Sequence, residues 1–375
     1  MLETITRRFD RQDDPFLRLV LLLHLQMSAK VSQAIRSNGG VRQAIEVLAP
    51  ERKEVDHLCR LLDRELAAME RWQTRAISPG HPEWPAVLDT AWDPPPLLYL
   101  RGRLPDFQKV PGLALVGSRI PTEYGLRITR ALAGIWTEMG GCVVSGGAKG
   151  IDSSAHLACM EKKGTTLCVF GTGIARPYPA GNRTLFQRIF DQGGGLISEL
   201  PMCGPVRGFS FPRRNRIIAG LAEVVVVTQA GEKSGALHTA TFALKSARLL
   251  FTVPAPIDEE AYRGGLKLLE QGVPALTSAE RLAHSFACAG RVAPPKQLSL
   301  ALEPKRKAVS VSKLDNKSRL ALELLEQGPV HLDDLGESLG LEQGQLALLL
   351  MDMETAGWIE KSAGNRYICV VRVER

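Results

Sequence analysis

The middle of the chain alternates short apolar runs with glycine turns and helical segments, and this alternation constrains the fold more than any other feature. Continuous apolar strands that alternate with helices are typical of a parallel sheet covered on both faces. Ligands of such sheets bind at the carboxyl ends of the strands. The predicted strands are Leu113–Val116, Cys142–Ser145, Thr165–Phe170, Gly195–Ser198, Val224–Thr228 and Arg248–Val253.

The first glycine turn, Gly117–Arg119, opens a helix directly after a strand. Glycine lets a ligand approach the backbone, and the Ser118 hydroxyl and the free N–H groups of a helix start suit oxyanions. Arg119 adds a planar guanidinium that can bind a phosphate through two hydrogen bonds. We expect Gly117, Ser118 and Arg119 to contact an anionic ligand. The alternative is a tight turn that carries a surface arginine.

The second turn, Ser145–Asp152, repeats this pattern more strongly. Its glycines predict a nest of inward-pointing N–H groups, and its lysine supplies positive charge. It lacks the Gly-Lys-Ser/Thr ending of a P-loop. In the alternative interpretation Asp152 caps the following helix, and His156, one turn further along, is more typical of a packed structural residue than of a catalytic base. The predicted ligand contacts here are Ser145, Gly146, Gly147, Lys149 and Gly150.

Two further loop-to-helix junctions follow later strands. Gly171–Gly173 begins like a dinucleotide fingerprint, but Arg176 stands where the third glycine is required, which excludes a nicotinamide dehydrogenase. After Thr228, Ser234 and Gly235 are expected to close the same cleft from the far side. Four junctions on one sheet edge predict a long, cationic, glycine-lined groove. They offer no nucleophile–base pair, carboxylate pair or metal-ligand set, so we expect an anion-binding protein without catalytic residues, metal or cofactor.

The segment Phe209–Gly220 concentrates positive charge beside two aromatic side chains. Pro212 suits the first turn of a helix, so the arginines and Phe211 should lie at a helix start, which already attracts anions. Cations beside a flat apolar ring suit a phosphate backbone with a base stacked on the ring. A solvated helix start with a phenylalanine in the core is the alternative. The predicted ligand contacts here are Phe211, Arg213, Arg214, Asn215 and Arg216.

The positive charge of the chain lies in two regions. The net charge is +7; residues 111–275 carry 18 Lys and Arg against 12 Asp and Glu, and residues 285–313 carry 6 against 1. This excess indicates an anionic partner. The seven cysteines form no CxxC or Cys/His cluster, and the apolar run Leu19–Leu25 is too short to span a bilayer. We therefore expect a soluble, cytoplasmic protein with reduced thiols and no membrane contact.

Two regions precede the glycine-rich core. Residues 1–75 show apolar positions at helical spacing and predict an N-terminal helical domain. Residues 76–110 are proline-rich, with one strand predicted at Leu97–Leu100, and we interpret them as a connector that lies against the next domain. The α/β domain as a whole is assigned to residues 76–283.

Two regions follow the core. Residues 284–312, which include Lys305–Lys307, have no apolar period and predict a basic linker. Residues 313–375 predict three helices followed by a hairpin around Ala363–Asn365, the order of a winged helix. The third helix, Gln343–Thr355, lacks Lys and Arg, so we favour contact with a protein over binding in a DNA groove.

Six motifs of the core occur in one order along the chain. They are Gly117–Arg119, Ser145–His156, Gly171–Asn182, Ile197–Glu199, Phe211–Gly220 and Ser234–Ala240. Together they closely resemble the DprA/Smf family of bacterial DNA-processing proteins, and the resemblance is strong over residues 80–283. The family carries a SAM-like or helix-hairpin-helix domain where the N-terminal helices stand, and many members carry a small winged helix where the tail stands.

This resemblance implies an extended Rossmann-like fold that binds single-stranded DNA without sequence preference. It also implies a homodimer formed through that domain, protection of incoming single strands during natural transformation, and loading of RecA onto them. At matching positions it implies a base stacked on Phe211 and phosphates held by cations. The implied phosphate contacts are Arg119, Lys149, Arg213, Arg214 and Arg216.

The chain departs from the family pattern at several positions. The family usually has an aspartate where Ala175 stands, a glutamate where Gln229 stands and a glycine where Ala255 stands. Arg263–Leu266 replaces an asparagine-rich loop, and a Pro-Gly-Ile-Gly hairpin expected near Gln26–Ser28 is missing. These differences predict a groove tuned differently from that of typical members, and an N-terminal domain without the DNA-binding hairpin.

Two other functions could use a similar groove. Nucleotide phosphoribohydrolases cleave a nucleotide there, with a catalytic glutamate in the helix after a Gly-Gly-x-Gly-Thr loop. The corresponding helix here carries His238, Thr239 and Thr241 and no acidic residue. A nucleotide-sensing adaptor would bind a mononucleotide in the groove and a partner through the winged helix. Turnover of AMP supports the enzyme, and mononucleotide binding without polynucleotide binding supports the adaptor.

Overall fold

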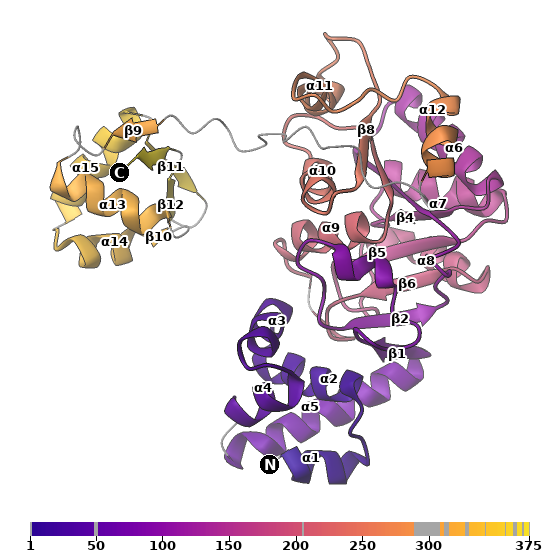
Figure 1. The fold of residues 1–375 in the computed structure, drawn as a ribbon, viewed down its shortest axis with the longest axis horizontal. Coiled ribbons are helices and arrows are strands. Elements are labelled where there is room, and N and C mark those ends of the chain that lie inside the picture. The colour runs from indigo at the N-terminus through magenta and orange to yellow at the C-terminus, as the bar shows by residue number, and fades with distance from the viewer. Residues whose placement is uncertain are drawn as a thin grey trace. The chain divides into compact units, whose positions relative to one another are not determined.

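The computed structural model divides into two compact units, Met1–Leu298 and Ser299–Arg375 (Figure 1). The predicted linker residues Lys305–Lys307 and the predicted hairpin tip Ala363–Asn365 lie outside the described residues. The residues that the structure describes are 2–48, 52–204, 206–288, 308–310, 315–326, 330–341, 343–356, 358–362, 366–369 and 371–374.

The first unit is built on an eight-stranded sheet with the order β1-β2-β6-β5-β4-β3-β7-β8. All six strands predicted in the core are present and run parallel to one another. Nearly all of their residues are buried, as expected for a sheet covered on both faces. The predicted mixed α/β fold is therefore confirmed. These strands are β3 (Gly112–Gly117), β4 (Cys142–Ser145), β5 (Thr166–Phe170), β6 (Gly195–Ser198), β7 (Val224–Gln229) and β8 (Leu249–Thr252).

The predicted connector is part of this sheet, which corrects its interpretation as a segment that only lies against the next domain. It contributes β2 (Leu98–Gly102), which pairs antiparallel with β6, and β1 (Thr74–Ile77), which pairs antiparallel with β2. Strand β1 was not predicted, and it crosses the expected domain limit between residues 75 and 76. Pairing with β2 satisfies the backbone N–H and C=O groups at the free edge of β6.

Helices cover both faces of the sheet. On one face, α6 (Glu123–Glu138), α7 (Ile151–Glu161) and α12 (Ala279–Cys288) share a core with strand residues such as Leu115. Figure 1 shows α9 (Ser210–Gly220) and α10 (Ala236–Lys245) on the opposite side from α6 and α12. The remaining helices of this region are α8 (Arg183–Asp191), α11 (Arg263–Glu270) and the short 3-10 turns Ala86–Thr90, Ala180–Asn182 and Glu260–Tyr262.

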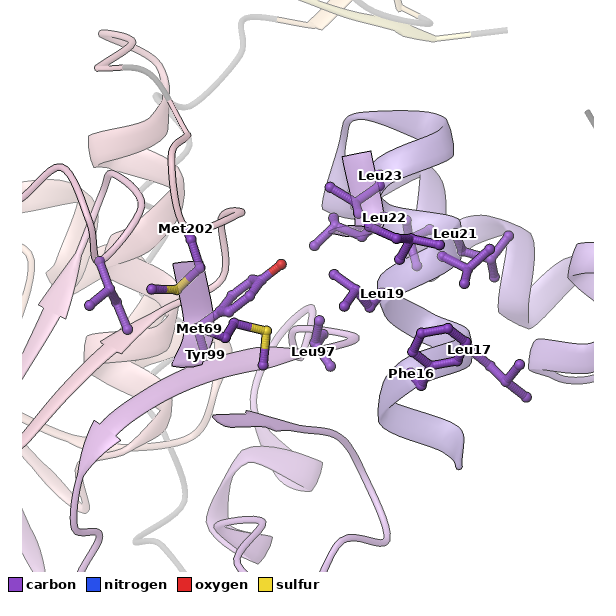
Figure 2. Close-up of a cluster of buried hydrophobic side chains, with 14 of the residues drawn as sticks. Phe16, Leu17, Leu19, Leu21, Leu22, Leu23, Met69, Leu97, Tyr99 and Met202 are labelled. Carbon is purple, nitrogen blue, oxygen red and sulfur yellow. The ribbon is translucent and has the colours of Figure 1, made fainter. Parts of the chain in front are cut away.

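The N-terminal helices share a hydrophobic core with the β1–β2 side of the sheet. In Figure 2, Leu19 and Leu22 face Tyr99 and Met202 across this core. The buried Glu65 carboxylate accepts a hydrogen bond from the Met202 N–H at 2.6 Å, which ties the helices to the loop after β6. The predicted helices are confirmed, within one compact unit with the sheet. They are α1 (Leu2–Phe9), α2 (Asp14–Leu25), α3 (Ser28–Ser37), α4 (Val41–Val47) and α5 (Arg52–Arg71).

The second unit has the predicted winged-helix order of three helices and a hairpin. Its core includes Leu322, Leu335 and Leu350. Two expected limits are corrected, because α12 continues past residue 283 and Ala308–Ser310, assigned to the linker, forms a strand beside β13. The elements are β9 (Ala308–Ser310), α13 (Asn316–Glu326), β10 (Val330–His331), α14 (Leu332–Leu339), α15 (Gln343–Thr355), β11 (Ile359–Ser362), β12 (Arg366–Cys369) and β13 (Arg372–Glu374).

A half-buried carboxylate at the amino ends of β3 and β7 predicts a pH-dependent stability. Glu223 accepts a hydrogen bond from the Gly112 N–H, and burial raises its pKa to about 7 from the usual 4.5. The folded state thus holds this proton more tightly than the unfolded state, so the stabilisation is complete below about pH 4.5 and is lost as pH rises to 7.

We expect Glu223→Gln to keep the acceptor for Gly112 and to remove this pH dependence. As the pH rises from 5 to 8, the wild type should lose about 2–3 kcal/mol more unfolding free energy than the variant. Urea unfolding of both proteins at the two pH values measures the difference. An equal change in both proteins would contradict a pKa of Glu223 raised to about 7 in the folded state.

Candidate nucleic-acid interface

A groove of about 990 Å³ opens at the carboxyl ends of β3, β4 and β7. The strand order reverses at β3, since the chain proceeds to β4, β5 and β6 on one side and returns to β7 on the other. Parallel sheets bind ligands at such a switch point because the loops diverge there. The predicted site residues that line the groove are Gly117, Ser118, Arg119, Phe211, Arg214, Asn215, Ser234 and Gly235.

Exposed cations from three segments of the chain face this groove. Arg119, Lys233 and Arg263 line it, and none of them forms an ion pair with a carboxylate among the described residues. Glu232 also lines it, but its carboxylate is paired with Lys267, which lowers the pKa of Glu232. The groove therefore carries positive charge that is not paired among the described residues. Glu260 is a further acidic side chain in its wall.

Sequence reasoning missed two of these cations. Lys233 directly precedes the predicted pair Ser234 and Gly235, so its position in that loop could have identified it as a groove residue. Arg263 begins α11, well beyond the last predicted junction, and only the tertiary fold brings it to the groove.

An aromatic wall stands beside the cations. Phe211 is half-buried at the start of α9, and its ring centroid lies 5.4 Å from that of Tyr178 at an interplanar angle of 53°. A Cβ at Gly171 would lie 2.7 Å from Phe211 Cδ1, so glycine is needed there for the ring to pack. Tyr178 is 42% exposed and lines the groove together with Phe211, while the more exposed Phe209 does not.

The expected anion nest after β4 already holds a carboxylate of the protein. Asp152 Oδ2 accepts hydrogen bonds from the N–H groups of Gly146 at 3.1 Å and Ala148 at 3.3 Å. The Ser145 hydroxyl donates to the Leu115 carbonyl at 2.7 Å. Ser145, Gly146 and Gly147 are buried and do not line the groove. Asp152 therefore binds the turn that precedes α7 and makes no side-chain cap for that helix, so the alternative of a helix cap does not fit. The expected ligand contacts of the three buried residues do not fit this geometry either.

The rest of that turn brings two loops together. Gly150 has a φ of +83°, and a Cβ there would lie 2.4 Å from the Ser118 carbonyl oxygen. Glycine is therefore required for the close approach of the turns after β3 and β4, and Gly150 itself does not line the groove. Lys149 is exposed on this turn, next to the groove-lining Ala148.

Arg214 lines the groove but uses its donors within the protein. Its Nη1 donates to the Gly146 carbonyl at 2.8 Å and to the Val169 carbonyl, and its Nε donates to Asn215 Oδ1 at 3.1 Å. Burial lowers the pKa of Arg214, and burial together with the charge of Arg214 lowers the pKa of His156 to about 3. His156 is therefore neutral at physiological pH, which fits the structural interpretation of this residue.

The other two arginines of α9 point away from the groove. Arg216 is 1% exposed; its Nη1 donates to Glu199 Oε2 at 2.9 Å and its Nε to Asp93 Oδ2 at 3.1 Å. Arg213 lies 3.6 Å from Asp93 and 3.8 Å from Glu199. Neither arginine lines the groove. The expected phosphate contact of Arg216 therefore does not fit the structure, because successive helix residues point in different directions and this one faces the buried Glu199 and the half-buried Asp93.

Two structural features are absent from the described part of the chain. No three His, Cys, Asp or Glu side chains within it gather as metal ligands would. None of its helices has an apolar stretch of the length that a bilayer requires.

The fold and the groove together define a Rossmann-like α/β protein with a groove at the switch point of its sheet, and cations and aromatic rings line this groove. Residues 75–287 match the family described as DNA recombination-mediator protein A, and residues 305–365 match the DprA winged helix domain. The chain belongs to the DprA/Smf family of DNA-processing proteins, as its motifs indicated.

Curated relatives and solved structures extend this likeness. The Smf protein of Synechocystis is 40% identical over 56% of this chain and 53% of its own length, so this chain matches about half of that relative. The Escherichia coli Smf protein is 30% identical over 88% of this chain and 86% of its own length. The X-ray structure of DprA from Streptococcus pneumoniae is 29% identical, covers 69% of this chain and 93% of its own, and has a TM-score of 0.58.

A second solved structure concerns DNA directly. DNA processing protein A from Helicobacter pylori is 29% identical and has a TM-score of 0.52, over 58% of this chain and 96% of its own. The work on that protein describes a unique single-stranded DNA binding mode.

Proposed function

We propose that the chain binds single-stranded DNA without sequence preference in the groove at the carboxyl ends of β3, β4 and β7. The observation that carries this proposal is the placement of unpaired cations and a Phe211–Tyr178 wall in one groove. Cations suit the phosphates of a strand, and aromatic faces stack on bases of any sequence. The single-stranded DNA binding described for the Helicobacter pylori relative supports the same ligand class.

The roles of the groove residues follow from their exposure. We assign phosphate contacts to Arg119, Lys233 and Arg263, with Lys149 beside the groove, and base stacking to Phe211 with Tyr178. Arg214 contributes positive potential, while its N–H groups bind the carbonyl groups of Gly146 and Val169. We propose that the backbone of the single-stranded DNA passes close to five further residues of the groove wall. These are Gly117, Ser118, Asn215, Ser234 and Gly235.

Three further roles rest on family membership alone. We propose that the chain forms a homodimer through the Rossmann-like domain, protects single strands and loads RecA onto them in natural transformation or recombination. These roles need neither catalysis nor a cofactor. They place the protein in the cytoplasm, where its proposed DNA and RecA partners lie.

Arg119→Ala tests the groove. We expect weaker binding to single strands of every sequence, because a phosphate contact carries no sequence information. The log–log dependence of affinity on salt should flatten by about 0.7, the value for one phosphate neutralised on a single strand. Fluorescence anisotropy with several labelled oligonucleotides at a series of salt concentrations measures both quantities.

Arg130→Ala is the matched control, since Arg130 is exposed on α6 and does not line the groove. It removes the same charge from the chain and should leave the salt slope near that of the wild type. If Arg119→Ala also keeps the wild-type slope, the phosphates of the DNA do not bind in this groove.

A further inference from the structure

A second cavity, of about 550 Å³, lies across one loop from the groove. Its floor is apolar and includes Phe170, Phe186 and Leu196. Pro177 lines this cavity, and the next residue, Tyr178, lines the groove. The two cavities therefore share one loop as their common wall.

A cation that forms no ion pair among the described residues lies in this second cavity. The Arg101 guanidinium lies 4.0 Å from the Phe190 ring centroid and 5.4 Å from the Trp72 ring. Its Nη2 donates to Gln187 Oε1 at 3.3 Å, whereas its Nε is buried and has no hydrogen-bond partner. Among the described residues, no carboxylate forms an ion pair with it, and burial lowers its pKa.

One exposed carboxylate acts on this cation without forming an ion pair with it among the described residues. Asp191 is the carboxylate whose charge acts on Arg101, and its Oδ1 accepts a hydrogen bond from Gln187 Nε2 at 2.7 Å. The two aromatic faces stabilise the Arg101 cation in part. A partly buried charge without an ionic partner is costly, so this site favours an anion brought by a ligand.

The remaining walls fit a phosphate beside a planar group. Arg183, the first residue of α8, is exposed and lines the same cavity with Thr184. The N-terminal end of a helix adds a favourable potential for an anion. The apolar floor and the Trp72 indole provide surfaces against which a base can pack.

We propose that this cavity binds one nucleotide unit, with its phosphate at Arg101 and Arg183 and its base against the apolar floor and Trp72. The inference rests on the proposed function for its ligand class. The unit comes from a strand that leaves the groove past Tyr178, or from a free nucleotide. The cavity would lengthen the stretch of single-stranded DNA that one protomer contacts.

Two variants of the full chain test this site without disturbing the groove. Arg183→Ala removes the exposed cation, and Ala175→Asp places a carboxylate on the cavity wall, where Ala175 is half-buried. Both should weaken binding of a long dT oligomer by about tenfold, the effect of one charge-assisted hydrogen bond. Binding of the shortest dT oligomer that fills the groove should not change. Arg188→Ala, an exposed arginine of α8 outside the cavity, is the control.

Photocrosslinking locates the base directly. Oligomers and dTMP analogues that carry 5-iododeoxyuridine are irradiated on the full chain, and the labelled peptide is identified by mass spectrometry. A Trp72 crosslink from the oligomer assigns the cavity to the strand, and one from the mononucleotide alone assigns it to a free nucleotide.

The proposal is overturned if neither probe labels Trp72 and neither variant alters binding of the long oligomer. If Arg119→Ala still weakens binding in that case, single-stranded DNA binding in the groove stands without the second site. If the wild-type chain does not bind single-stranded DNA at all, both the proposed function and the second site are wrong.

Discussion

Replacing Arg216 by alanine is expected to destabilise the first unit by about 3–5 kcal/mol, the typical result of removing one partner from a buried ion pair. The variant leaves Glu199, which is 5% exposed, and Asp93, which is 24% exposed, without the guanidinium that joins them. These acids precede α9 in two separate loops, so Arg216 joins both loops to the middle of the helix whose first turn carries Phe211. Urea unfolding followed by circular dichroism measures the loss.

Asp63→Ala provides the comparison. Asp63 pairs with Arg8 at 2.8 Å, with both side chains about half exposed, and such a surface pair contributes less than about 1 kcal/mol. Under conditions where Arg216→Ala remains folded, its affinity for single-stranded DNA should be close to that of the wild type. If Arg216→Ala keeps the stability of the wild type but loses DNA binding, Arg216 contacts a phosphate of the DNA after all.

Phe211→Ala is expected to weaken single-stranded DNA binding by about 1–3 kcal/mol, the range for loss of one base–aromatic stack. The salt slope should change little, because the substitution removes no charge. The ring is free to stack because Gly171 leaves room behind it and Tyr178 supports its side. Anisotropy titrations with a labelled dT oligomer at two salt concentrations separate the two quantities.

Phe209→Ala is the matched control, since Phe209 is 58% exposed two residues earlier and does not line the groove. It should alter binding far less than Phe211→Ala. A loss below about 0.5 kcal/mol for Phe211→Ala, or equal losses for both variants, would assign Phe211 to the core.

The strands of the core were predictable because burial on both faces requires unbroken apolar runs, as in Val224–Thr228. The aromatic residue at the start of α9 was also located from local pattern. The third glycine turn, Gly171–Gly173, was expected to line the groove, but it is buried and does not do so. The pairing of β1 with β2, and of β2 with β6, was not predictable in the same way. Thr74–Ile77 has no such apolar run, and the strands that pair here are distant in sequence.

Side-chain direction limited the prediction of the site. Three arginines within four residues look equivalent in the sequence, yet Arg214 holds two carbonyls and Arg216 holds two acids. The turn after β4 has the composition of an anion nest, but the anion it holds is Asp152 from the same turn. Only the three-dimensional structure distinguishes an anion within the protein from one brought by a ligand.

The central claim is that the groove binds single-stranded DNA, and the most direct test is fluorescence anisotropy with a labelled dT oligomer of a few tens of nucleotides. Titrations at two salt concentrations, with AMP and a matching duplex as competitors, separate the candidate ligands. The account predicts tight, salt-sensitive binding that neither competitor displaces. Absence of binding at low salt, with AMP bound in its place, would contradict it and favour the nucleotide enzyme or sensor.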